Sequence, residues 1–142
     1  MKVRDLMNGN VIDIGAEETV EVAARMLLHY NIGSLPVRDI NGGLCGMVTD
    51  RDIVTRCLAS GRKPGDTWVR DVMTSRVYTV SPDMDVSAAA HLMGKQQIRR
   101  LPVLENGKVC GILSLGDLAG SEECVYDAAD AYNDIACGIS QR

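Results

Sequence analysis

The sequence lacks any long run of apolar residues. No stretch of its 142 residues approaches 18 consecutive apolar side chains, roughly the length that a helix needs to cross a bilayer. The opening residues, MKVRDLMNG, alternate apolar and charged side chains, whereas a secretory signal peptide gathers about 7–15 apolar residues in one run. We therefore expect a cytoplasmic protein with no membrane contact.

Paired cysteine motifs are also absent. The five cysteines are odd in number, include no Cys-x-x-Cys pair and have no histidine nearby at metal-ligand spacing. This pattern argues against a disulfide framework and against a zinc site. We expect reduced thiols, no metal and no tightly bound cofactor, and the pattern leaves a redox role open. The cysteines are Cys45, Cys57, Cys110, Cys124 and Cys137.

An excess of positive charge and a catalytic pair are missing as well. The chain has 15 Lys and Arg against 19 Asp and Glu, a net charge of -4, and so lacks the basic footprint of a nucleic-acid binder. Its two histidines, His29 and His91, have no cysteine or carboxylate arranged with them for nucleophilic or acid–base catalysis. We expect neither enzyme activity nor a nucleic-acid partner. With 46% hydrophobic and 24% charged residues, the composition is that of a soluble globular protein.

What the sequence does contain is an internal repeat. VRDLM at residues 3–7 recurs as VRDVM at residues 69–73, and Ile-x-x-Leu-Pro-Val at residues 32–37 recurs at 98–103. After a one-residue contraction in a turn, Cys45-Gly46 recurs as Cys110-Gly111. Self-similarity at a fixed period predicts two copies of one supersecondary unit.

Each copy predicts the element order β-α-β-β-α. A short alternating strand precedes a helix whose apolar side chains recur at i, i+3, i+4 and i+7. Two short apolar strands joined by Asn-Gly turn chemistry follow, and a second helix closes the copy. The predicted first strands are residues 11–14 and 77–80, the helical stripes start at Val20 and Val86, and the closing helices begin near Thr49 and Ser114.

The predicted fold class is therefore α/β in the α+β sense, with two tandem β-α-β-β-α repeats and a C-terminal helical tail. The repeats should pack about a pseudo-twofold axis, because roughly 50–60 residues alone leave apolar faces uncovered. In the tail, an approximate one-face spacing of Val125, Ala128, Ala129, Tyr132, Ile135 and Ala136 predicts a helix packed on the repeats or on a second copy of the chain. The predicted boundaries are 1–62 for the first repeat, 63–70 for a linker, 71–121 for the second repeat and 122–142 for the tail.

The most informative motif is Gly-φ-x-(Thr/Ser)-x-x-Asp, where φ is apolar, at each predicted strand-to-helix junction. It contains Thr49 and Asp52 in the first copy and Ser114 and Asp117 in the second. Unpaired N–H groups at a helix start suit phosphate, and a carboxylate there can accept both hydroxyl protons of a ribose. The same residues are nearly a capping box, in which both side chains only satisfy N–H groups of the first turn. The motif alone leaves both interpretations open.

These repeated motifs resemble the cystathionine-β-synthase domain, or CBS domain, whose tandem pairs are called Bateman modules. The resemblance covers nearly all of residues 3–120 and rests on the lead-in, the Leu-Pro-Val strand and the junction motif, each present twice in the same order. A pair without a fused enzyme or channel is similar to small stand-alone bacterial CBS proteins of the hypoxic-response type.

The resemblance implies a regulatory module that binds an adenosine nucleotide in the cleft between the copies. AMP, ADP and ATP are the expected ligands, and NAD and S-adenosylmethionine stay open. The ligand would change the packing of the repeats, the chain would form a homodimer, and the regulated protein partner is not identified by the sequence. The alternative hypothesis is a ligand-free structural, dimerisation or protein-interaction module.

The resemblance also assigns residues to the nucleotide site. Asp52 and Asp117 match ribose-binding aspartates, and Thr49 and Ser114 match hydroxyls that touch ribose or phosphate. First-strand residues whose backbone reads the adenine edge, and apolar residues that flank the base, complete each site. These are Asp13, Ile14, Thr79 and Val80 for the strand segments and Ile32 and Ile98 for the flanks.

The two copies differ where the phosphates are expected. Arg99 and Arg100 occupy positions from which family members reach phosphate, and the rigid guanidinium fork suits that contact. Gly33 and Ser34 stand at the same places in the first copy. We therefore expect unequal sites, with the one that uses Ser114 and Asp117 better occupied.

Overall fold

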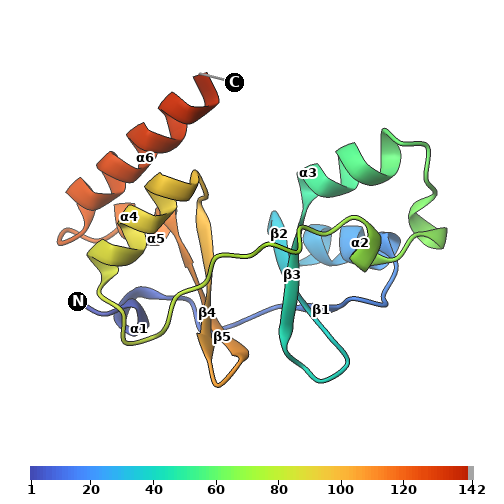
Figure 1. The fold of residues 1–142 in the computed structure, drawn as a ribbon, viewed down its shortest axis with the longest axis horizontal. Coiled ribbons are helices and arrows are strands. Elements are labelled where there is room, and N and C mark those ends of the chain that lie inside the picture. Colours follow the sequence, from blue (N-terminus) through green and yellow to red (C-terminus); the bar gives the residue numbers. More distant parts are fainter. Residues whose placement is uncertain (141–142) are drawn as a thin grey trace. The chain divides into compact units, whose positions relative to one another are not determined.

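Two small β-sheets, each backed by helices, organise the chain (Figure 1). A computed structural model describes residues 1–140. Contacts divide it into a central unit, Ile12–Val77, and a C-terminal unit, which combines Met1–Val11 with the chain from Tyr78 onward. Each unit holds its own cluster of buried apolar side chains. The mixed α+β fold and the C-terminal helix expected from the sequence are confirmed.

The central unit has a three-stranded sheet in the order β1-β2-β3. The short strand β1 runs parallel to β2, and β2 pairs antiparallel with β3. Its strands are β1 (Ile14–Gly15), β2 (Ser34–Arg38) and β3 (Leu44–Thr49), and its helical segments are α2 (Val20–Tyr30), α3 (Asp50–Asp52), a π-helical stretch (Ile53–Leu58) and two 3-10 turns (Pro64–Asp66 and Val69–Asp71).

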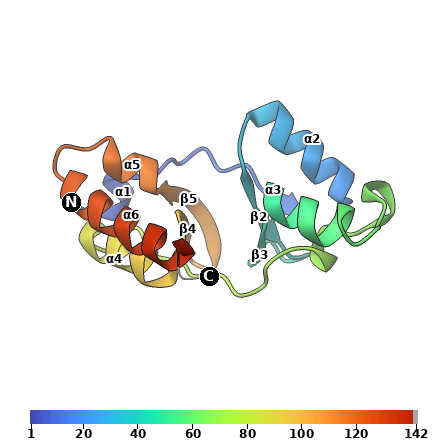
Figure 2. The same cartoon turned by 90° about the horizontal axis from the view of Figure 1, so that it is seen from above.

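The C-terminal unit repeats this plan and adds a helix. The hairpin of β4 and β5 is antiparallel, and α6 packs along α4 and α5 in both views (Figures 1 and 2). Its elements are α1 (Val3–Leu6), α4 (Val86–Gln96), β4 (Arg100–Glu105), β5 (Lys108–Ser114), α5 (Leu115–Ala119) and α6 (Val125–Ser140).

The predicted strand at residues 77–80 is wrong in extent. Only Val80 pairs, in an isolated parallel bridge with Val103. In the central unit the ladder continues because the backbone N–H of Ala16 donates to the carbonyl of Arg38, 3.0 Å away. The equivalent residue in the second copy is Pro82, which has no N–H to donate, so pairing stops after one residue. The first-copy strand also starts later than predicted, at Ile14.

The helices α2 and α4 form where the apolar stripes predict them, and both have local caps. The hydroxyl of Thr19 accepts a hydrogen bond from the N–H of Val22 at the start of α2. Asp85 does the same for Ser87 at the start of α4. Side-chain caps of this kind satisfy N–H groups that have no partner within the helix.

The repeated lead-in segments are exchanged between the copies. Residues 3–7 precede the first copy, yet Asn8 bridges to Ile112 in β5 of the second copy. Residues 69–73 precede the second copy, yet Thr74 bridges to Met47 in β3 of the first. Each lead-in therefore completes the fold of the other copy, and for this reason the compact units cut across the repeats. The repeat boundaries at residues 62, 70 and 121 stay a prediction.

Close approach at two equivalent glycines makes this exchange possible. A Cβ atom at Gly111 would lie 2.5 Å from the sulfur of Met7, and one at Gly46 would lie 2.6 Å from the sulfur of Met73. Real Cβ atoms do not approach so closely, so only glycine admits the lead-in methionine.

In residues 1–140, no helix combines the length and the apolar character that crossing a membrane requires.

Candidate functional site

The two junction motifs form complete capping boxes with nearly the same geometry. In the first copy, the hydroxyl of Thr49 accepts from the N–H of Asp52 at 3.0 Å, and Oδ2 of Asp52 accepts from the N–H of Thr49 at 3.0 Å. In the second copy, the corresponding distances between Ser114 and Asp117 are 3.1 Å and 2.8 Å. Each pair starts a short helix, α3 or α5. The capping hydrogen bonds are therefore present in both copies, and each hydroxyl keeps its own proton to donate.

The two copies differ in what surrounds the second carboxylate oxygen, Oδ1, of the junction aspartate. Oδ1 of Asp52 lies 3.7 Å from a guanidinium nitrogen of Arg56, and that nitrogen also donates to the carbonyls of Val72 and Met73 at 3.0 Å. Ser121 stands in the place of Arg56 in the second copy. Among residues 1–140, no hydrogen bond or ion pair reaches Oδ1 of Asp117. The second copy thus presents a carboxylate oxygen that can accept a hydrogen bond from a ligand.

A cavity of about 440 Å³ in the C-terminal unit is lined in part by Ser114, the capping partner of Asp117. Arg99 and Arg100 lie at the start of β4, and Ser114 lies at the end of β5, where the two strands are paired. The lining contains two guanidinium groups and two hydroxyl groups but no carboxylate, so its charge favours an anion. The lining residues are Arg99, Arg100, Ser114, Leu115, Gly116, Ala119 and Tyr132.

The cavity has a size that small-molecule sites commonly have, since ligand pockets run from about 300 to 1,000 Å³. Three residues predicted from the sequence, Arg99, Arg100 and Ser114, meet in its wall. Asp117 adjoins it through the capping box with Ser114. The residues that the sequence assigns to phosphate therefore lie together within one unit.

The remaining predicted site residues do not line this cavity. In the central unit, the carboxylate of Asp13 is 2.6 Å from the guanidinium of Arg38, Ile14 is buried in β1, and Ile32 packs against the core. In the C-terminal unit, Thr79 is partly buried, Val80 is buried in the core, and Ile98 packs against that core. Their assignment to the adenine base stays a prediction.

Sequence reasoning missed most of the apolar wall of the cavity, including Tyr132 of α6. The buried face of α6 consists of Cys124 just before it and Ala128, Ala131 and Ile135 within it. The sequence predicted Val125, Ala129 and Tyr132 on that face, and this was wrong because all three are exposed. The apolar periodicity of this segment was weak enough to fit two neighbouring faces of the helix. In the structure, the face with small residues packs on α4. No sequence signal marks Tyr132 as part of a cavity.

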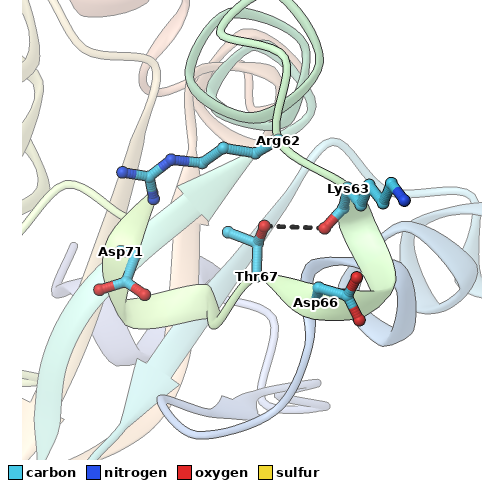
Figure 3. Close-up of a pocket in the computed structure, with 5 residues that line it drawn as sticks. All are labelled: Arg62, Lys63, Asp66, Thr67 and Asp71. Carbon is cyan, nitrogen blue, oxygen red and sulfur yellow. Dashed lines mark hydrogen bonds between the residues drawn. The ribbon is translucent and has the colours of Figure 1, made fainter.

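A second cavity, of about 360 Å³, lies in the central unit at the predicted linker. Figure 3 shows Arg62 and Asp71 on one side of Thr67, and Lys63 and Asp66 on the other. The hydroxyl of Thr67 donates to the carbonyl of Lys63 at 2.7 Å. Two basic and two acidic side chains balance one another here, and none of the predicted site residues is present. This cavity has no electrostatic preference for an anionic ligand.

Cysteine and metal chemistry have little support in the described part of the chain. Residues 1–140 contain no group of three or more His, Cys, Asp or Glu side chains placed to hold a metal ion. Burial, with a smaller contribution from Asp39, raises the pKa of the Cys45 thiol. A raised pKa keeps a thiol protonated and lowers its reactivity as a nucleophile.

The chain is similar to several known proteins over most of its length. The CBS domain family matches residues 3–59 and 69–122. YhcV of Bacillus subtilis, a CBS domain-containing protein, is 37% identical over 134 residues, which cover 94% of each chain.

Two solved structures connect the fold with bound groups in other proteins. A crystal structure of Hypoxic Response Protein I with two coordinated zinc ions has a TM-score of 0.77 and 33% identity, covering 84% of this chain and 97% of that chain. The CBS domain pair of protein MJ0100, in complex with 5′-methylthioadenosine and S-adenosyl-L-methionine, has a TM-score of 0.75 and 30% identity, covering 84% and 93%. The repeated motifs, the paired β-α-β-β-α units and these similarities together show that the chain belongs to the CBS domain family and carries two CBS domains in tandem.

Proposed function

We propose that this chain is a regulatory module that binds an adenosine nucleotide at its second CBS domain and has no catalytic activity of its own. The observation that carries the proposal is the cavity in which Arg99, Arg100 and Ser114 meet beside Asp117. The adenosyl ligands in the structure of the MJ0100 domain pair support an adenosyl compound as the ligand. Phosphate is favoured by the two guanidinium groups, because arginine donates paired hydrogen bonds to phosphate oxygens.

Each polar group at the cavity has a distinct role in this proposal. Oδ1 of Asp117 accepts hydrogen bonds from the ribose hydroxyls while Oδ2 keeps the cap. The hydroxyl of Ser114 accepts from the N–H of Asp117 and donates its own proton to a phosphate or ribose oxygen. Arg99 and Arg100 neutralise the phosphates. AMP, ADP and ATP all fit this chemistry.

The first domain is proposed to bind such a ligand more weakly. Arg56 forms a 3.7 Å ion pair with the second oxygen of Asp52, and Gly33 and Ser34 stand in place of the two arginines. A ribose would have to compete with the Arg56 guanidinium, and no arginine at the strand start would compensate the phosphate charge. The proposed module therefore has one preferred nucleotide site.

Regulation follows from differential binding. A ligand that binds one packing arrangement of the two domains more tightly than another shifts the chain toward that arrangement. We propose that this shift is passed on, in a cytoplasmic homodimer, to a protein partner.

Thermal unfolding of the purified chain with AMP, ADP, ATP, NAD and S-adenosylmethionine tests the proposal. Ligand that binds only the folded state at 100 times its Kd stabilises it by about 2.7 kcal/mol, which raises the Tm by several degrees. Asp117→Ala should abolish this rise, whereas Asp52→Ala, which removes the same cap in the first domain, should keep it. Equal retention of the rise in both variants would contradict the assignment of the site.

The complete capping boxes support a second candidate, a protein-interaction module without a ligand. In that case the hydroxyl and the carboxylate of each motif serve only the first turn of α3 or α5. Both aspartate variants would then lower the Tm of the unliganded chain by similar amounts, because loss of a cap costs about 0.5–2 kcal/mol. None of the five compounds would raise the Tm of the wild type.

A further inference from the structure

The wall of the nucleotide cavity is completed by α6, a helix that follows the second CBS domain. Tyr132 is the α6 residue that lines it, opposite residues from β4, β5 and α5. Its side chain is 56% exposed, so packing in the core does not bury it. An aromatic ring with a hydroxyl group at the edge of a cationic cavity can pack against a ligand and donate a hydrogen bond to it.

The position of Tyr132 is fixed by the packing of its neighbour Ala131. Ala131 is buried against α4, where a Cβ atom at Gly94 would lie only 3.3 Å from the Cα of Ala131. The same Cβ atom would lie 2.7 Å from a carboxylate oxygen of Asp134. In the first turn of α6, Asp127 accepts a hydrogen bond of 3.1 Å from the hydroxyl of Ser87. The orientation of α6 on α4, and with it the place of Tyr132, thus depends on small residues at the helix crossing.

We propose that Tyr132 contacts the nucleotide in this cavity and that nucleotide binding and the docking of α6 on α4 and α5 therefore stabilise one another. The inference rests on the proposed nucleotide site. It adds that the docking of α6 depends on whether that site is occupied. Coupling is reciprocal: if docked α6 strengthens nucleotide binding, bound nucleotide strengthens docking by the same factor.

Two variants separate a ligand contact from a structural effect. Tyr132→Ala should weaken binding of AMP and ATP roughly three- to tenfold, the loss expected for one hydrogen bond or aromatic contact. Its unliganded Tm should match that of the wild type, because exposed surface substitutions change stability little. Tyr126→Ala is the matched control, since Tyr126 is also on α6, is 83% exposed and does not line the cavity. Gly94→Val should also weaken binding, because it prevents close docking of α6 without changing a cavity residue.

Hydrogen exchange of the full-length chain, with and without AMP and with and without ATP, completes the test. Residues 125–138 of the wild type should gain protection with nucleotide, and Tyr132→Ala should lose this gain. If nucleotide binds in an Asp117-dependent way but leaves exchange in α6 unchanged, and Tyr132→Ala binds as Tyr126→Ala does, the coupling is refuted while the proposed function stands. If no nucleotide stabilises the wild type, both proposals fail together.

Discussion

The two CBS domains of this chain share one fold and one capping geometry, yet the side chains around the two junction motifs differ. The second domain has Arg99 and Arg100 at the strand start, an unoccupied oxygen on Asp117 among the described residues, and the helix α6 beside the cavity. In the first domain, Arg56 forms an ion pair with Asp52. Both domains thus keep the same scaffold, and the proposed nucleotide site uses side chains that only the second domain has.

The helix faces of the two domains differ in the same way. Gly94 in α4 is buried under α6, and the equivalent residue in α2 is Leu28, which is 83% exposed. A glycine inside a helix destabilises it by roughly 0.5–1 kcal/mol relative to alanine, but it lets a second helix approach closely. A leucine at that place holds a neighbouring backbone away. Gly94 is thus one residue that lets α6, which directly follows the second domain in the chain, pack closely on α4.

The largest effect, on the free energy of unfolding, is expected in the cores, where the two domains are alike. Leu35 and Leu101 are equivalent residues, both fully buried. Replacing either with alanine should lower the free energy of unfolding by about 2–5 kcal/mol, because a large buried side chain is lost and a cavity remains. Hydrogen exchange should show the loss of protection mainly in the unit that carries the change. Similar loss in both units from either variant would contradict the division into two cores.

The next effect should separate the domains through charge. The double variant Arg99→Ala/Arg100→Ala should lower the affinity for ATP by roughly 10- to 150-fold, since a hydrogen bond to a charged group contributes about 1.5–3 kcal/mol. Binding of 5′-methylthioadenosine, which has no phosphate, should change little. Titration calorimetry gives both affinities, and Arg25→Ala, a change at an exposed arginine of α2, is the control. Equal losses for both ligands would argue against a phosphate contact.

A smaller effect tests whether the caps are equivalent. Ser114→Ala and Thr49→Ala should each lower the free energy of unfolding by about 1 kcal/mol, because each removes the hydroxyl that caps a helix. Urea denaturation measures this change. Only Ser114→Ala should also weaken nucleotide binding. Stability that falls in one variant but not the other would show that the two junctions are not the same cap.

The smallest effect concerns the ion pairs that hold the exchanged lead-ins. Arg4 contacts Asp83 at 2.6 Å, and the equivalent pair in the central unit is Arg70 with Glu17 at 3.2 Å. The hydrogen bond from Arg4, followed by its charge, lowers the pKa of Asp83. Because the folded-state pKa is below the unfolded one, the pair stabilises the fold above the ordinary aspartate pKa of about 3.9 and loses this effect as pH falls through the lowered value.

Comparison of Asp83→Asn with the wild type at several pH values measures that pair. The Tm difference should be small at pH 7, because exposed ion pairs contribute little, and should disappear at low pH and in 1 M salt. Glu17→Gln is the matched change in the central unit. A difference that grows as the pH falls would contradict the assigned sign.

Much of this architecture can be read from the sequence, because the repeat, the helical stripes and the junction motif are local patterns. The element order, the long helices and the meeting of Arg99, Arg100 and Ser114 follow from them. The lost strand around Val80 depends on one missing N–H at Pro82, and the pattern of apolar residues does not show it. The exchange of the lead-ins and the position of Tyr132 depend on packing between distant segments. Weak one-face periodicity in a helix rich in alanine could not fix the buried side of α6.

We propose the second domain as the preferred nucleotide site. Hydrogen exchange of the wild-type chain with saturating ATP tests it most directly, because it reports on both domains in one measurement. We expect strong added protection in residues 98–119, and little in the equivalent residues 32–54. Protection that is equal in the two segments, or greater in the first, would contradict it.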